Sequence, residues 1–141
     1  REIAGVVLAV GKQVVRYGTP VRSPAMILAA GETTVHVRGR GSGGRNQELV
    51  LAGIPQLGVD MTLASFGTDG IDGITPKPVA GAMADAGTLA RALRQKLDPH
   101  SYLVANDSYH FFQRVHGHIL TGRTGTNVGD LIVLAIRSNR K

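Results

Sequence analysis

A stretch of ten residues, Gly39–Glu48, combines glycines and arginines in a pattern typical of anion binding. Glycines such as Gly43 and Gly44 let backbone N–H groups approach a ligand closely. Arg45 adds a fixed positive charge at the start of the apolar segment Leu49–Leu57, which has the character of a helix. A glycine-rich turn at a helix N-terminus favours phosphate or carboxylate ligands. Taken alone, the stretch is equally compatible with a turn that carries surface arginines.

Two aspartates lie in a second glycine-rich loop, directly after the apolar stretch Met61–Phe66. Asp69 and Asp72 are three residues apart, each precedes a glycine, and Thr68 comes just before them. Two carboxylates at this spacing could hold Mg²⁺ or accept the proton of a substrate hydroxyl. Asp-Gly pairs also form ordinary turns, which leaves a purely structural role open.

Two further polar segments follow along the chain. The first, Asn106–Ser108, could cap a helix and do nothing more. The second, Thr121–Asp130, carries small hydroxyls, glycines and Arg123, a composition that suits a ligand rich in anionic oxygens. The alternative for this segment is a polar loop before a strand. None of these loops has the spacing of a P-loop or of a dinucleotide-binding turn.

The apolar periodicity predicts how these loops are positioned. Helix-like and strand-like segments alternate, which indicates an α/β fold, layered α/β/α with a mixed sheet. In such folds polar loops cluster beyond the strand ends. We expect helices at Glu2–Tyr17, Arg45–Gln56, Ala80–Leu97 and from Asp107 onward, strands at Ala25–Ala30, Thr33–Arg38, Met61–Phe66 and Leu131–Ile136, and a short strand or extended segment at Tyr102–Ala105.

The composition excludes several classes of function. The chain has 141 residues, which is the size of one domain, and no cysteine, so it has no disulfide or thiolate metal site. The net charge of +6 is spread along the chain with few aromatic residues, which argues against nucleic acid as a partner. We expect no membrane segment and a cytoplasmic location. Because the chain starts without methionine, we expect it to be cut from a longer protein.

Four stretches taken together resemble one family. GETTVHVRGRGSGGRNQELVLA, ASFGTDGIDG, ANDSYHFF and TGRTGTNVGDLIVL are similar to the C-terminal MOFRL domain of class II glycerate kinases, which are also named hydroxypyruvate reductases. The order and spacing of the stretches match from Pro24 to Ile136. We therefore expect residues 1–141 to form a single MOFRL-like domain, with a lead-in helix and connection at 1–24 and a core at 25–136.

The resemblance implies an activity and a missing partner. It implies ATP-dependent phosphorylation of D-glycerate to 2-phosphoglycerate, with Mg²⁺ as the divalent cation. It also implies that the active site lies between this domain and a larger, Rossmann-like N-terminal domain, which carries the catalytic lysine of the family. This sequence contains neither that domain nor its lysine, so we expect the isolated chain to be inactive.

The resemblance also assigns roles to particular residues. Arg45 corresponds to the family arginine and is expected to contact the phosphoryl or carboxylate group. Asp69 and Asp72 are the expected catalytic carboxylates, and they are also the candidates for Mg²⁺ or for the substrate hydroxyl. Candidate substrate- and phosphate-binding residues from the same motifs are Gly43, Gly44, Asn46, Glu48, Thr68, Asn106, Asp107, Thr124, Thr126 and Asn127.

The chain departs from the family pattern at two points. Arg123 replaces a proline, which frees the loop and adds charge. The segment Gly73–Ala82 is longer and lacks an acidic residue of the family. Two alternatives to the kinase remain open. The other name of the family suggests an NAD(P)H-dependent hydroxypyruvate reductase, and the two departures together with the missing lysine suggest a non-catalytic module for binding or interaction. The sequence leaves open whether the protein is a homo-oligomer.

Overall fold

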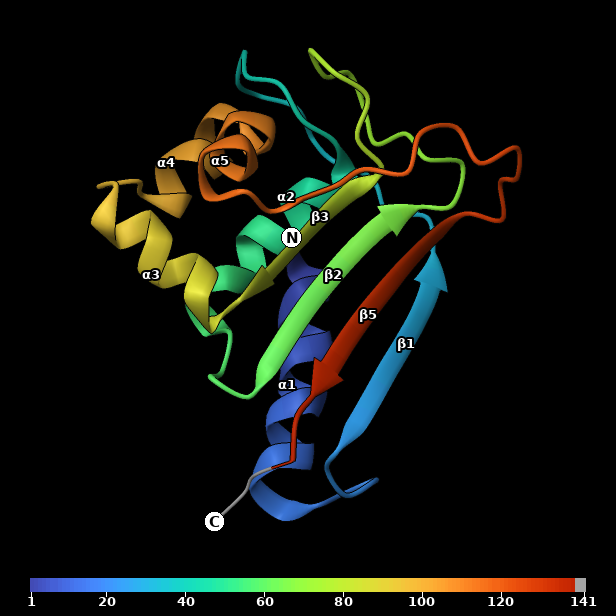
Figure 1. Ribbon diagram of the computed structural model, residues 1–141, viewed down its shortest axis with the longest axis vertical. Coiled ribbons are helices and arrows are strands. Elements are labelled where there is room, and N and C mark those ends of the chain that lie inside the picture. The colour runs from blue at the N-terminus through green and yellow to red at the C-terminus, as the bar shows by residue number, and fades with distance from the viewer. Residues whose placement is uncertain (139–141) are drawn as a thin grey trace.

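The frame of the molecule is a five-stranded sheet in the order β1-β5-β2-β3-β4, in a computed structural model that describes residues 1–138 (Figure 1). All paired strands are antiparallel. The strands are β1 (Ala25–Gly31), β2 (Met61–Gly67), β3 (Gly81–Asp85), β4 (His118–Ile119) and β5 (Asp130–Ile136). The helices are α1 (Glu2–Tyr17), α2 (Arg45–Gly53), α3 (Ala86–Arg94), α4 (Pro99–Ala105) and α5 (Ser108–Val115), and a 3-10 turn, η1 (Ile54–Gln56), follows α2.

The predicted α/β class is confirmed, but the expected mixed sheet is wrong. A parallel pair needs a long crossover, usually a helix. The loop between β2 and β3 contains no helix, so β3 returns antiparallel to β2. The expected α/β/α layering is wrong as well. Within residues 1–138 the helices cover one face of the sheet (Figure 1). On the other face, Met26 and Leu28 of β1 are exposed.

Alternating side chains of the strands divide the sheet into a covered face and an open face. In β2 and β5 every second residue is buried, and the residues between them are half-buried. The buried set includes Leu63 and Leu134, which lie in one core with Leu8 of α1 and Leu51 of α2. Burial of this kind is the main favourable contribution to folding. It fixes which face of each strand the helices cover.

Helix α1 spans the residues that the apolar periodicity predicted. It ends where Gly18 adopts a left-handed conformation (φ 67°) and donates its N–H to the carbonyl of Val14 at 2.9 Å. Glycine adopts that conformation without a steric cost, so it terminates the helix. None of the helices described within residues 1–138 is long and apolar enough to cross a bilayer.

The predicted helix Ala80–Leu97 is wrong over its first part. Gly81–Asp85 forms β3, which pairs with β2, and the helix α3 begins only at Ala86. Pairing with a neighbouring strand outweighs the helix propensity of the alanines. Asp85 then starts α3, because its carboxylate accepts the N–H of Thr88 at 2.8 Å in a capping box.

Two further element predictions are wrong. Thr33–Arg38 belongs to no ladder, although its alternating β-branched residues predicted a strand. β propensity requires a partner strand, and none of the described residues pairs with this segment. Tyr102–Ala105 is the end of helix α4, where the sequence predicted an extended segment. The Asp98 carboxylate caps this helix by accepting the N–H groups of His100 and Ser101, both at 3.1 Å.

Strand register places three loops at one end of the sheet. Gly31, the last residue of β1, pairs with Asp130, the first residue of β5, and Asp130 pairs with Gly67, the last residue of β2. The segments 32–44, 68–80 and 120–129 therefore leave or enter the sheet at the same end, shown at the top of Figure 1. We call these three segments the loop cluster. They contain most of the residues that the sequence singled out.

Candidate active site

Arg45 lies at the base of the loop cluster and is held there by two carboxylates. Its Nε and Nη2 donate to the two oxygens of Asp130, at 2.5 and 3.0 Å. Its Nη1 lies 3.2 Å from the carboxylate of Glu32. Asp130 is 4% exposed, so the pair is anchored in the fold, while Glu32 is exposed. A bidentate contact of this kind fixes the plane of a guanidinium group.

The guanidinium group of Arg45 remains charged and partly accessible. The hydrogen bond to Asp130 is the main cause that raises the pKa of Arg45. Asp130 uses two of the five N–H groups that a guanidinium carries, so the outer edge keeps donors for another anion. Asp130 and Glu32 were not among the predicted site residues, because only the fold brings them to Arg45. The available signal was a carboxylate at the first position of an otherwise apolar strand.

Asp72 caps helix α2 from a distant part of the chain. Its Oδ1 accepts the backbone N–H of Asn46 at 3.0 Å, and its Oδ2 accepts the backbone N–H of Gln47 at 2.9 Å. The side-chain amides of the same two residues also donate to this carboxylate, at 3.2 and 3.0 Å. A Cβ at Gly44 would overlap the Asp72 carboxylate, so glycine is required for this close approach.

The anion at the N-terminus of α2 is therefore a side chain of the protein itself. Asp72 is 2% exposed, and this burial raises its pKa, against the opposing effect of the N–H donors of Asn46 and Gln47. Asn46 is buried too, and its Oδ1 accepts the hydroxyl of Ser65 at 2.5 Å. The structure places both predicted site residues beneath the loop cluster rather than on its surface.

Asp69 differs from Asp72 in its surroundings. Its Oδ1 accepts the N–H of Ile71 at 3.0 Å within the turn, and within residues 1–138 no group donates to its Oδ2. Asp69 is half-buried. Among residues 1–138 no group of three or more His, Asp or Glu side chains could hold a metal ion. With both oxygens of Asp72 engaged, the arrangement does not fit a cation held between Asp69 and Asp72.

Threonine side chains join the second and third loops of the cluster. The Thr124 hydroxyl donates to the carbonyl of Thr68 at 2.5 Å, and the Thr124 N–H donates to the carbonyl of Asp69 at 3.3 Å. The Thr68 hydroxyl donates to the carbonyl of Gly129 at 2.8 Å. These contacts place the predicted Thr-Gly-Thr-Asn loop against Asp69. Further along this loop, Thr126 and Asn127 are exposed.

Asn106 and Asp107 hold the glycine-rich segment in place. Asn106 Oδ1 accepts the backbone N–H groups of Arg38 and Gly39, both at 2.8 Å. Asp107 Oδ1 accepts the backbone N–H of Ser42 at 3.0 Å. Side-chain acceptors thus satisfy three backbone donors of a loop that has few other partners. The two predicted binding residues, Asn106 and Asp107, therefore accept hydrogen bonds from the backbone of the glycine-rich segment.

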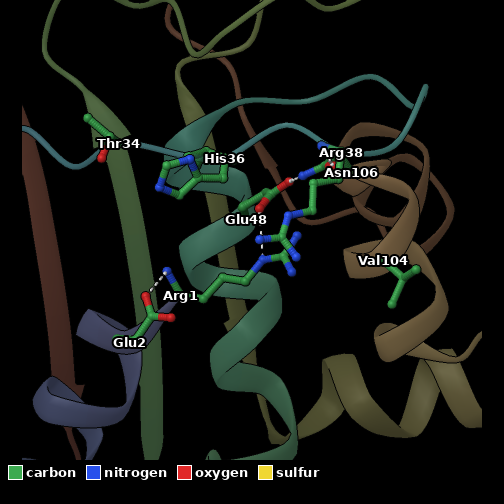
Figure 2. A pocket seen from close by; sticks show the side chains of 9 residues that line it. Arg1, Glu2, Thr34, His36, Arg38, Glu48, Val104 and Asn106 are labelled. Carbon is green, nitrogen blue, oxygen red and sulfur yellow. Dashed lines mark hydrogen bonds and ion pairs between the residues drawn. The ribbon is translucent and has the colours of Figure 1, made fainter.

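Glu48 of α2 lies beside a cavity, apart from the Arg45 and Asp130 pair. Its buried carboxylate accepts from the side-chain amide of Asn106 and from Arg1 Nε, the latter at 3.1 Å. Figure 2 shows these side chains pointing toward one another beside a cavity of about 380 Å³. His36 and Arg38 also line this cavity, so basic groups surround a buried carboxylate.

The structure therefore separates the predicted site residues into two sets. In the first set, Thr68, Asp69 and Thr124 belong to the loop cluster and Arg45 lies at its base. Each of the four side chains is half-buried or exposed, so a ligand can approach it. A second set holds the loop backbone or the start of α2, and its polar atoms are largely occupied by the protein. The second set consists of Asn46, Glu48, Asp72, Asn106 and Asp107.

Known proteins similar to this chain are named as kinases. The chain is 42% identical over 135 residues to a D-glycerate 2-kinase of Thermotoga maritima, a match that covers 94% of this chain and 32% of that protein. It is also 42% identical over 125 residues to a glycerate kinase of Homo sapiens, covering 82% of this chain and 24% of the relative. The chain thus spans about a quarter to a third of the length of these relatives.

Two solved structures have the same fold as this chain. The crystal structure of a Thermotoga maritima glycerate kinase superposes with a TM-score of 0.90 at 40% identity, over 96% of this chain and 33% of that one. A protein from Pyrococcus horikoshii superposes with the same TM-score at 29% identity, over 98% of this chain and 32% of the other. The arrangement of strands and loops described above is therefore shared with both.

A family model accounts for the same region. The model of the MOFRL family matches residues 25–130, which include β1, α2, the loop cluster and the first residue of β5. This range contains the first three motifs of the sequence resemblance and the fourth as far as Asp130. With the fold, the loop positions and the family model in agreement, the chain belongs to the MOFRL family.

Proposed function

We propose that this chain is the part of a D-glycerate 2-kinase that lines one side of the catalytic cleft. The enzyme would transfer the γ-phosphoryl group of ATP to the 2-hydroxyl of glycerate. The relatives named glycerate kinase support this assignment, and they favour it over a hydroxypyruvate reductase. The remaining two thirds of the relatives would supply the opposite side of the cleft.

Arg45 is the proposed contact for the transferred phosphoryl group. Catalysis of phosphoryl transfer consists mainly of positioning and of neutralising negative charge. Arg45 meets both requirements, because Asp130 fixes its orientation and its outer edge keeps N–H donors. An incoming phosphoryl oxygen would compete with the exposed carboxylate of Glu32 for this edge.

Asp69 is the proposed acceptor of the substrate proton. As the glycerate 2-hydroxyl oxygen bonds to the γ-phosphorus and ADP leaves, the hydroxyl proton passes to the carboxylate of Asp69. Among the described residues, none donates a hydrogen bond to the Oδ2 of Asp69, whereas both oxygens of Asp72 accept N–H groups. We therefore assign Asp72 a structural role, in place of the catalytic and metal-binding roles expected from its motif.

One observation carries this proposal: the strand register brings Arg45 and Asp69 to the same end of the sheet. Asp130 pairs directly with Gly67, two residues before Asp69, and also binds Arg45. A cationic group and a half-buried carboxylate therefore lie at the same end of two adjacent strands. These are the two groups that an in-line phosphoryl transfer to a hydroxyl uses.

The experiment is a kinase assay on the complete protein that contains this chain. The substitution Arg45→Lys should lower kcat for glycerate phosphorylation about 100-fold, because lysine cannot reproduce the fixed bidentate geometry. Arg40→Lys is the matched control, since Arg40 is an exposed arginine in the glycine-rich segment that precedes α2. Equal kcat values for the two variants would contradict the proposal. So would NAD(P)H oxidation with hydroxypyruvate in the absence of kinase activity.

The isolated chain provides a second test. It should fold but not phosphorylate glycerate, since only one side of the cleft is present. Adding the remainder of the protein as a separate chain should restore turnover. Glycerate phosphorylation by the 141-residue chain alone would contradict the role given to the missing part.

A further inference from the structure

The two carboxylates that hold Arg45 differ in how firmly they are fixed. Asp130 is buried and accepts two N–H groups of the guanidinium, whereas the Glu32 side chain is 69% exposed and contacts only Nη1. Within residues 1–138 the side chain of Glu32 has no other ion pair or hydrogen bond. Displacing Glu32 therefore breaks one exposed contact, while displacing Asp130 would leave a buried carboxylate without its cation.

The backbone around the two carboxylates differs in the same way. Asp130 is part of the sheet and pairs with Gly31 on one side and with Gly67 on the other. Glu32 follows Gly31, the last residue of β1, and begins a segment that belongs to no strand. A Cβ added at Gly31 would meet no atom within 4 Å, so the space beside this bend is open. The side chain of Glu32 can therefore move away from Arg45 without disturbing the sheet.

The local charge opposes an added anion as long as Glu32 stays in place. Asp130 and Glu32 carry two negative charges against the one positive charge of Arg45, so a phosphoryl group would approach a net negative site. Once Glu32 moves away, the pair of Arg45 and Asp130 is neutral and the N–H groups of Nη1 are free. These N–H groups can then donate to phosphoryl oxygens. Release of Glu32 is thus a condition for binding an anion at this edge.

We propose that Glu32 is a positioning residue that occupies the outer edge of Arg45 until a phosphoryl group displaces it. The inference rests on the proposed function, in which Arg45 contacts the transferred phosphoryl group. A carboxylate attached to the same chain competes at a high effective concentration, so a ligand with one weak contact leaves the ion pair intact. A phosphoryl group carries more negative charge and more acceptor oxygens than a carboxylate, and it replaces Glu32.

The substitution Glu32→Gln removes this competition and keeps the length of the side chain. Exposed ion pairs contribute little free energy, so the competition weakens binding by no more than about fivefold. We expect the variant to bind phosphoryl ligands about two- to fivefold more tightly, and its KM for ATP to fall by the same factor. We expect kcat to stay within about twofold, because Asp130 still fixes the guanidinium.

The test measures binding and turnover separately in the complete protein that contains this chain. Calorimetry with inorganic pyrophosphate gives a Kd without catalysis, and a kinase assay with ATP and D-glycerate gives KM and kcat. Asp60→Asn is the matched control, because it removes the same charge just before β2, at the end of the sheet away from the loop cluster. The length of β2 is about 20 Å, and salt at about 0.1 M screens charges beyond about 10 Å. The control should therefore leave the pyrophosphate Kd unchanged.

The possible results separate this proposal from the proposed function. A pyrophosphate Kd that Glu32→Gln leaves unchanged, or changes no more than Asp60→Asn does, would overturn the role of Glu32. Failure of pyrophosphate to bind either the unchanged protein or Glu32→Gln would overturn it as well. So would a kcat lowered tenfold or more by Glu32→Gln, since Glu32 would then be needed during the reaction. Tighter pyrophosphate binding by Glu32→Gln, in a protein that does not phosphorylate glycerate, would support the role of Glu32 and reject the kinase.

Discussion

Asp69 and Asp72 belong to one loop and to the same Asp-Gly pattern, yet they lie on opposite sides of the loop cluster. On the inner side, Asp72 is 2% exposed and accepts N–H groups from the start of α2. On the outer side, Asp69 accepts a single N–H within its own turn. The comparison teaches that burial and prior hydrogen bonding, rather than residue type, decide which carboxylate can serve a ligand.

The same comparison explains what the glycine-rich segment does. A helix N-terminus with free N–H groups attracts an anion, and here Asp72 is that anion. Its carboxylate stabilises the first turn of α2, from which Arg45 extends toward the loop cluster. The inner side of the cluster thus supports the start of α2, and the outer side carries the groups that we propose to contact substrate.

The largest effect on stability is expected for Asp72→Ala. The substitution leaves the backbone N–H groups of Asn46 and Gln47 buried without acceptors. We expect the free energy of unfolding to fall by about 3 kcal/mol, the usual cost of losing a cap and of leaving buried donors unsatisfied. Urea denaturation of the 141-residue chain measures this loss. An unchanged urea midpoint would show that Asp72 does not stabilise the fold, and the proposed structural role of Asp72 would then be wrong.

A smaller loss is expected for Asn106→Ala, which frees the glycine-rich segment without touching α2. The variant loses the acceptor for the N–H groups of Arg38 and Gly39 and the donor to Glu48. We expect a cost of about 2 kcal/mol. Hydrogen exchange should accelerate at Arg38 and Gly39 and remain slow in α2. Unchanged exchange at the loop would show that Asn106 does not support it.

Asp85→Ala tests whether burial determines the cost of losing a helix cap. Asp85 caps α3 as Asp72 caps α2, but it remains half exposed. We expect a cost of about 1 kcal/mol at neutral pH. Partial burial raises the pKa of Asp85, but hydrogen bonds from Thr88 and the charge of Arg91 outweigh it, so its folded pKa lies below 3.8.

The sign of this shift predicts how the effect depends on pH. Because the folded pKa is lowered, the contribution of Asp85 is fully present above about pH 3.8 and is lost as the pH falls through the folded pKa. Urea curves of the unchanged chain and of Asp85→Ala should therefore converge in acid. A difference that grows as the pH falls would contradict this assignment.

The smallest effect on stability is expected for Asp69→Asn. The amide keeps an oxygen that can accept the N–H of Ile71, so the turn remains satisfied. We expect a change of less than about 0.5 kcal/mol in the free energy of unfolding, as for most substitutions away from buried networks. A loss as large as that of Asp72→Ala would place Asp69 in the structural set.

Periodicity alone predicted the elements whose patterns are strong. Helix α1 and the strands β1, β2 and β5 lie where their apolar spacing placed them. Local sequence could not predict β3, because its alanines favour a helix and only the neighbouring β2 makes them a strand. The strand prediction for Thr33–Arg38 was wrong for the opposite reason: its β-branched residues favour a strand, but they have no partner strand among the described residues.

The location of the site followed from the sequence more readily than the roles of its residues. The motifs placed Arg45 at the end of a glycine-rich segment and Asp69 in a polar loop, and the sheet brings that segment and that loop to the same end. The burial of Asp72 and the pairing of Asp130 with Arg45 depend on contacts 26 and 85 residues apart in the chain, which no local pattern encodes. Side chains that hold a loop and side chains that bind a ligand are of the same polar types.

The most direct test of this account is the kcat of Asp69→Asn in the complete protein, measured with ATP and D-glycerate beside its urea midpoint. The account predicts a kcat at least about 100-fold lower, the usual effect of removing a general base, with an unchanged midpoint. A kcat within about twofold of the unchanged enzyme, at the same midpoint, would contradict the assignment of Asp69 to the chemistry.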